Sequence, residues 1–126
     1  MPDGDGPVPQ GMLAASVAAG VSGPVIVLSG EADLASVAQL SALITAQLSR
    51  GTRQLTIDVS ELRFADSATI RTLVLAAKTL KHRGGSLVLL RPRQPMIRLL
   101  DLLGAAPMFT IRGKTKGRPE SEDQSG

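Results

Sequence analysis

The stretch that decides the fold begins with Leu55-Thr-Ile-Asp-Val59, continues through Phe64-Ala-Asp-Ser67 and ends with Ala68-Thr-Ile-Arg-Thr-Leu73. In the first part apolar and polar residues alternate, which predicts a strand with one buried face. The middle part predicts a loop that leads into a helix. The helix ends at Gly84-Gly85, and its apolar residues recur at helical spacing and are expected to be buried: Ile70, Leu73, Val74, Ala77 and Leu80.

Toward the N-terminus the sequence predicts a hairpin and a second helix. Val25–Leu28 is a β-branched run typical of a buried strand, and the turn residues 20–24 make Leu13–Ala18 its hairpin partner. Asp33 can cap a helix that runs to about Arg50 and stops at Gly51. The apolar stripe of this helix is expected at Val37, Leu40, Ile44 and Leu48.

Toward the C-terminus the pattern of strand and helix continues. Leu87–Leu90 predicts a third buried strand, Pro95 suits the first turn of a helix that stops at Gly104, and Met108–Ile111 predicts a last short strand. The inward residues of this helix are expected to be Met96, Leu99, Leu100 and Leu103. The whole order predicts an α/β fold with a mixed, mostly parallel sheet of four to five strands packed with helices.

The two ends of the chain differ in composition from its middle. Residues 1–11 are rich in Gly, Pro and Asp, and we expect them to form a flexible leader. Residues 113–126 are polar, and we expect a disordered tail there. Residues 12–112 then form one domain of ordinary size.

The composition excludes much of ordinary enzyme chemistry. The 126 residues include no Cys and one His, so disulfides, thiol catalysis and cysteine-ligated zinc are ruled out. The sequence also has no glycine-rich loop that ends in Lys-Ser or Lys-Thr, as a phosphate-binding loop would. We therefore expect no cofactor and no bound metal.

The distribution of charge bears on possible partners. All 14 Lys and Arg lie between Arg50 and Arg118. The charged residues among the first 49 are all Asp or Glu. A basic half can indicate nucleic-acid binding, but the chain has two Phe and no Tyr or Trp for base stacking. No segment approaches the roughly 20 apolar residues that cross a bilayer. We expect a cytoplasmic protein that binds neither nucleic acid nor membrane.

Asp66-Ser67 places a carboxylate and a hydroxyl where a strand turns into a helix. The simplest interpretation is a helix cap, in which Asp66 or Ser67 accepts hydrogen bonds from free backbone N–H groups. A second possibility is that Asp58, Glu61 and Asp66 converge on one sheet edge and hold magnesium, as in a small metal- or nucleotide-dependent enzyme. Solvated or capping carboxylates are the interpretation that the rest of the sequence favours.

Three further features lie before and after this pair along the chain. Gly30-Glu-Ala-Asp33 joins a strand to a helix, Gly84-Gly85 follows the second helix, and Leu99-Leu-Asp-Leu-Leu-Gly104 closes the third. Together with Asp66-Ser67, this set resembles the bacterial anti-sigma factor antagonists of the STAS-domain family. The resemblance covers about Leu13 to Arg112.

The resemblance implies a partner and a switch. Members of the family bind an anti-sigma factor, often an ATP-dependent serine kinase, and so free a sigma factor for transcription. The kinase phosphorylates a serine that corresponds to Ser67, and a serine phosphatase restores it. Asp66, Asp33 and Asp58 match the aspartates of the family's pattern. Ala68 and Thr69 replace its second serine and its glycine, which makes Thr69 a secondary candidate for phosphorylation.

A partner surface is expected on the second helix, opposite its buried stripe. There the helix presents Ala68, Thr72, Leu75 and Thr79, flanked by Arg71 and Lys78. The expected partner-binding set is Asp33, Asp66, Ala68, Thr69, Arg71, Thr72 and Leu75. Two alternatives remain at this stage. Leu75 could be covered by the neighbouring helix, or the domain could serve a stress-sensing or lipid-transport assembly with Ser67 as a mere cap.

Overall fold

The computed structural model describes residues 12–113, and these form a single five-stranded sheet with the strand order β1-β2-β3-β4-β5. β1 (Leu13–Gly20) and β2 (Gly23–Ala32) are an antiparallel hairpin. The next three strands are β3 (Gln54–Ala65), β4 (Ser86–Leu90) and β5 (Thr110–Arg112), and each neighbouring pair from β2 to β5 is parallel. The predicted mixed, mostly parallel sheet is confirmed. The expectations for residues 1–11 and 114–126 lie outside the described residues.

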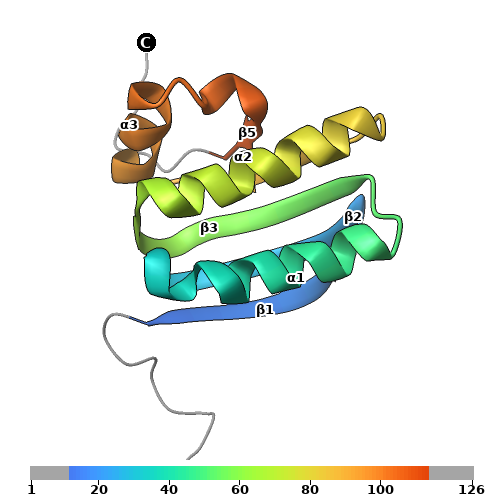
Figure 1. The fold of residues 1–126 in the computed structure, drawn as a ribbon, viewed down its shortest axis with the longest axis horizontal. Coiled ribbons are helices and arrows are strands. Elements are labelled where there is room, and N and C mark those ends of the chain that lie inside the picture. The colour runs from blue at the N-terminus through green and yellow to red at the C-terminus, as the bar shows by residue number, and fades with distance from the viewer. Residues whose placement is uncertain (1–11, 114–126) are drawn as a thin grey trace, which may run out of the picture.

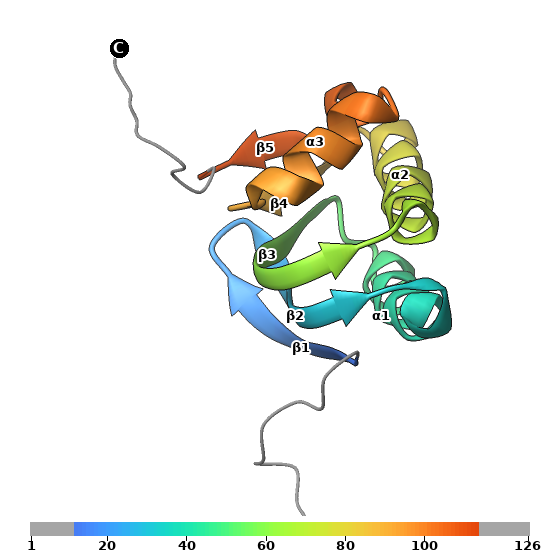
Figure 2. The ribbon, with the colours of Figure 1, turned by 90° about the vertical axis from the view of Figure 1, so that its left-hand side faces the viewer.

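The connections between the parallel strands are helical. α1 (Val37–Ser49) follows a 3₁₀ turn at Leu34–Ser36, and α2 (Ser67–His82) joins β3 to β4. These two helices lie side by side on one face of the sheet (Figures 1 and 2). α3 (Gln94–Leu102) and a 3₁₀ turn at Ala106–Met108 join β4 to β5, and α3 lies toward the end of the sheet where β3 runs into α2.

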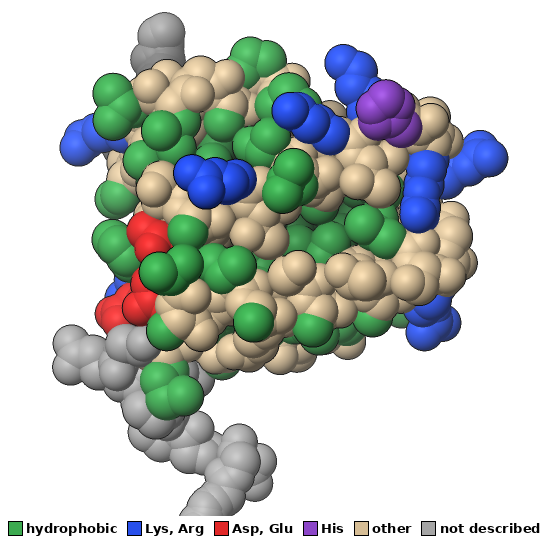
Figure 3. Space-filling view, in the orientation of Figure 1, with side chains coloured by type: hydrophobic (Ala, Val, Ile, Leu, Met, Phe, Trp, Pro, Cys, Tyr) green, Lys and Arg blue, Asp and Glu red, His purple; other side chains and the backbone are tan. Residues whose placement is uncertain are grey.

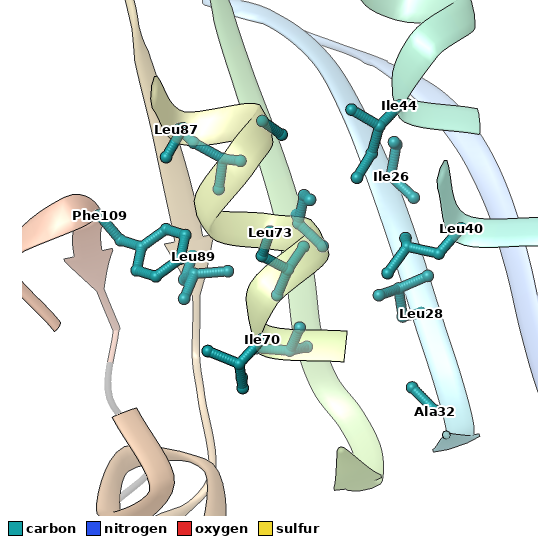
Figure 4. Packing of buried hydrophobic residues seen from close by; sticks show 14 of the residues in the cluster. Ile26, Leu28, Ala32, Leu40, Ile44, Ile70, Leu73, Leu87, Leu89 and Phe109 are labelled. Carbon is teal, nitrogen blue, oxygen red and sulfur yellow. The ribbon is translucent and has the colours of Figure 1, made fainter. Parts of the chain in front are cut away.

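The core lies between the sheet and the helix pair α1 and α2 (Figure 4). Alternate residues of β2, β3 and β4 point into it, as the period of a strand requires, and meet one face of each helix. The side chains with no more than 1% exposure include Ile26, Leu28, Ile57, Leu89, Leu40, Ile70, Leu73 and Leu80. The predicted stripe of α2 is confirmed, except that Val74 is half-buried and Ala76 is buried.

Several boundaries differ from the prediction, and β2 covers Gly23–Ala32 rather than Val25–Leu28 alone. β3 continues to Ala65, so Phe64 and Ala65 belong to a strand and not to a loop, because they pair with Glu31 and Ala32 of β2. The last strand is Thr110–Arg112, since the chain first makes the 3₁₀ turn at Ala106–Met108. Sequence periodicity shows none of these effects, since pairing with a distant strand sets how far a strand extends.

The predicted apolar stripes of α3 and α1 also differ from the structure at individual residues. Leu103 is 47% exposed, because α3 ends at Leu102 and Gly104, with φ +66°, turns the chain away. Gln47 is buried in α1, whereas Val37 and Leu48 of the predicted stripe are half-buried. Within residues 12–113, every helix is too short or too polar to cross a bilayer.

Candidate functional site

The hydroxyl of Ser67 is free at the start of α2. Asp66 is the N-cap residue, with φ −95° and ψ −179°, and its Oδ1 accepts a hydrogen bond from the Thr69 N–H at 3.0 Å. Ser67 is the first helical residue and is exposed, and no residue in the range 12–113 hydrogen-bonds its side chain. The cap interpretation therefore holds for Asp66 and is wrong for Ser67, whose hydroxyl is open to solvent.

Thr69 lies on the opposite side of the same helical turn and is 1% exposed. Its Oγ1 donates to Asp66 Oδ1 at 3.0 Å, so this carboxylate serves both the backbone and the side chain of Thr69. From the sequence, Thr69 is predicted to lie on the partner surface and to be a second candidate for phosphorylation. Both assignments are corrected, since a kinase and a partner need a group that solvent reaches.

We expect Asp66→Ala to destabilise the domain by about 2 kcal/mol, at the upper end of the range for a lost cap, because the buried Thr69 hydroxyl also loses its acceptor. Urea unfolding of the two proteins measures the difference. Asp66→Asn keeps a side-chain oxygen at the cap and is the matched control, which we expect within about 0.5 kcal/mol of the wild type. Equal unfolding midpoints for Asp66→Ala and the wild type would contradict this role of Asp66.

The outer face of α2 is open and carries an exposed apolar side chain between basic ones. Leu75 is 59% exposed, so the alternative that α1 covers it is wrong. Thr72 Oγ1 donates to the Ala68 carbonyl at 3.0 Å, and Thr79 Oγ1 donates to the Leu75 carbonyl at 3.1 Å. Because both hydroxyls bond their own helix, these threonines mainly add methyl groups to the surface.

A shallow groove runs beside Leu75, between α1 and α2. It is lined by Ser41, Ile44, Thr45, Leu48, Thr72, Leu75, Ala76 and Thr79, none of which is charged. Arg71 and Lys78 are exposed on α2. Figure 3 shows this face of the molecule, with basic side chains over α2 and apolar ones between the two helices. The arrangement suits a partner helix or strand that brings apolar side chains to the groove.

Asp33 follows β2 in the same way that Asp66 follows the neighbouring strand β3. It is the N-cap of the turn that precedes α1, and its Oδ1 accepts from the Ala35 N–H at 3.0 Å. Ala32 and Ala65 are register partners at the ends of β2 and β3, and the Asp66 N–H donates to the Ala32 carbonyl at 3.1 Å. The two capping aspartates therefore follow neighbouring strand ends, and acidic side chains gather at this end of the molecule (Figure 3).

A steric constraint explains why residue 30 of the Gly30-Glu-Ala-Asp33 motif is a glycine. Gly30 has φ +91°, and a Cβ on it would collide with the Met12 carbonyl oxygen at the start of β1. Only glycine adopts this conformation without strain and also allows the close approach of the two strands. The motif thus sets the path of the chain into the Asp33 turn.

A cavity beside Ser67 was missed by the sequence analysis. It has a volume of about 370 Å³, and its lining includes Asp66 and Ser67 on one side and Pro95, Met96 and Leu99 of α3 on the other. Phe64 also lines it and is 51% exposed. The sequence carries no local signal for it, because the cavity forms between β3 and α3, which are distant in the chain.

The carboxylates that were considered for magnesium lie in separate environments. Asp58 Oδ2 pairs with Arg91 Nη2 at 3.0 Å, and its Oδ1 accepts from the Ser60 N–H at 3.0 Å. Glu61 is exposed, and Asp66 is engaged by Thr69. In the part of the chain that the structure describes, no three potential metal-ligating side chains of His, Cys, Asp or Glu lie together. Asp58 is thus the ion-pair partner of Arg91.

Comparisons with known proteins agree with this geometry. A family model described as "Mlab, STAS domain" matches residues 15–110. BtrV of Bordetella bronchiseptica, named as an anti-sigma factor antagonist, is 30% identical over 84 residues, which are 67% of this chain and 72% of BtrV.

Two solved structures have the same fold. An anti-sigma factor antagonist from Mycobacterium paratuberculosis superposes with a TM-score of 0.71 at 23% identity, over 79% of this chain and 85% of that chain. The phosphorylated form of the Bacillus cell-fate determinant SpoIIAA superposes with a TM-score of 0.64 at 24% identity, over 78% of this chain and 90% of that chain. With the strand order, the capped turns and the matched residues taken together, the chain belongs to the STAS-domain family of anti-sigma factor antagonists.

Proposed function

We propose that this protein binds an anti-sigma factor that is also an ATP-dependent serine kinase, and that it thereby releases a sigma factor in the cytoplasm. Phosphorylation of Ser67 by the kinase switches the protein off, and a serine phosphatase restores it. The proposal rests on the different roles of Asp66 and Ser67 at the start of α2. Asp66 caps the helix and holds Thr69, which leaves the Ser67 hydroxyl exposed and uncommitted.

The start of α2 is a suitable place for a phosphate. A phosphate on Ser67 would add about −1.5 to −2 charges at neutral pH, beside free backbone N–H groups and the positive end of the helix dipole. The fold should therefore tolerate the modification. The switch then acts on the complex, where a doubly charged group must lose its hydration when the partner covers it.

The contact surface of the proposal has three parts. Ser67 and Ala68 lie at the start of α2, Arg71, Thr72 and Leu75 continue along its outer face, and Asp33 lies at the neighbouring strand end. The groove between α1 and α2 adjoins Leu75, and the cavity beneath Phe64 adjoins Ser67. A partner that covers Ser67 would thus meet apolar side chains on both sides, with Arg63 and Arg93 also lining the cavity.

Ser67 variants test the proposal. We expect Ser67→Ala to bind the anti-sigma factor with unchanged affinity and to accept no phosphate from it. Ser67→Asp should weaken the complex by about tenfold, because one carboxylate supplies part of the charge of a phosphate. Ser22→Asp, an exposed serine in the turn at the opposite end of β2, is the matched control and should bind normally.

Titration calorimetry and phosphopeptide mapping give the two readouts. Equal affinities for wild type, Ser67→Ala and Ser67→Asp would contradict the switch. Capture of a transporter ATPase from the native host, with no anti-sigma kinase, would assign the domain to another assembly.

A further inference from the structure

Within residues 12–113, β1 is an edge strand, and these residues give it none of the usual protection against pairing with another chain. It is eight residues long, and its register with β2 is unbroken from Leu13 to Gly20. Its sequence, Leu-Ala-Ala-Ser-Val-Ala-Ala-Gly, has no charged residue and no proline. Natural edges are normally blunted by charge, proline, a bulge or short length. The other edge strand, β5, is three residues long and ends in Arg112.

The backbone groups on the outer edge of β1 can be assigned. The Met12 carbonyl accepts from the Glu31 N–H, so the even-numbered residues bond β2. Antiparallel pairing alternates, and the N–H and C=O groups of Leu13, Ala15, Val17 and Ala19 therefore point away from β2. The Leu13 carbonyl does reach the Gln39 amide of α1 at 3.5 Å, which supports this assignment and covers that end of the edge.

The surface beside this edge carries little charge, apart from the exposed Arg50, which lines a hollow with Val17 and Ala19. α1 packs on the same side of the molecule, and none of its residues from Val37 to Ser49 is Lys, Arg, Asp or Glu. A globular domain carries charge at about one residue in four. Figure 3 shows the strip of neutral and apolar side chains over α1, with the basic residues at its end and over α2.

We propose that two copies of this protein pair through β1, antiparallel and about a two-fold axis, to form one continuous sheet. The faces of the sheet must match across the axis, so residues of equal parity face each other. The register that uses the free part of the edge places Val17 opposite Val17 of the partner, and Ala15 opposite Ala19. Each of these facing pairs exchanges two backbone hydrogen bonds.

The side chains fit this pairing. Val17 is 43% exposed on the helix-covered face of the sheet, so the two copies of Val17 would pack on each other at the axis. The flanking residues are alanines and Ser16, which leave room for the close approach of two strands. Ser67 and Leu75 lie on α2, separated from β1 by α1, so the dimer leaves these two residues open to a partner.

The oligomeric state of the full chain tests the proposal. Sedimentation equilibrium across the micromolar range should give a dimer of twice 13.1 kDa. Val17→Pro removes an N–H that points away from β2, so the hairpin should remain while the dimer dissociation constant rises by at least about tenfold. Val17→Ala keeps that N–H and is the matched control, which should still form dimers.

A charge pair at the axis resolves the case in which Val17→Pro fails to fold. Val17→Lys and Val17→Glu should each be monomeric, because like charges face each other at the axis, and an equimolar mixture should form a heterodimer. A wild-type monomer at all concentrations would overturn the proposal. So would a dimer that survives all these substitutions, or open-ended oligomers, which a closed two-fold pair excludes. None of these results bears on binding of the anti-sigma factor, which the Ser67 variants test.

Discussion

Replacing Leu75 by Asp is expected to weaken the complex with the anti-sigma factor by about a hundredfold or more, equivalent to ~3 kcal/mol. Leu75 is 59% exposed on α2 and adjoins an uncharged groove. In the complex an aspartate there would lose water without gaining a partner, and truncation or charging of a central apolar contact has effects of this size. The stability of the free domain should change by no more than about 0.5 kcal/mol.

Val21→Asp is the matched control for this experiment. Val21 is a fully exposed apolar residue in the β1–β2 turn, at the opposite end of β2 from Asp33. The same chemical change should leave affinity for the anti-sigma factor unaltered. If Leu75→Asp also bound normally, the partner would approach Ser67 from the side of α3 and its cavity, and the outer face of α2 would be excluded from the contact.

Leu73→Ala is expected to have the largest effect on stability. Leu73 has no exposed surface and lies in the core beneath α2. Loss of its buried methyl groups and the cavity left behind should cost about 2–5 kcal/mol, which is a large part of the roughly 5–15 kcal/mol of a typical domain. In urea the midpoint should fall while the slope stays the same.

The comparison with Leu75→Ala makes this prediction specific. Both residues are leucines of one helix, two positions apart, but only Leu73 faces the sheet. Leu75→Ala should therefore unfold within about 0.5 kcal/mol of the wild type. A cost below about 1 kcal/mol for Leu73→Ala would mean that the core can close around the missing side chain.

The local pattern of the sequence was sufficient for the order and type of the main elements. Alternating residues in Leu55–Val59 and a 3.6-residue stripe from Ile70 to Leu80 identified β3 and α2, because burial of one face depends only on the period of the backbone. The capping role of Asp33 was also predictable, and so was the glycine, Gly104, that turns the chain just after α3. They involve groups within a few residues of each other in the chain.

Only the tertiary structure decided the features that depend on contacts between distant segments of the chain. Ser67 and Thr69 are both hydroxyl residues of one turn, yet α2 is rotated on the sheet so that Thr69 is buried and Ser67 is exposed. The extension of β3 to Ala65 depends on its pairing with β2, and the cavity beside Ser67 depends on where α3 packs. The ion pair between Asp58 and Arg91 likewise joins β3 to the residue that follows β4. These arrangements follow from the packing of whole elements, whose energies are spread over many residues and leave no periodic trace in the sequence.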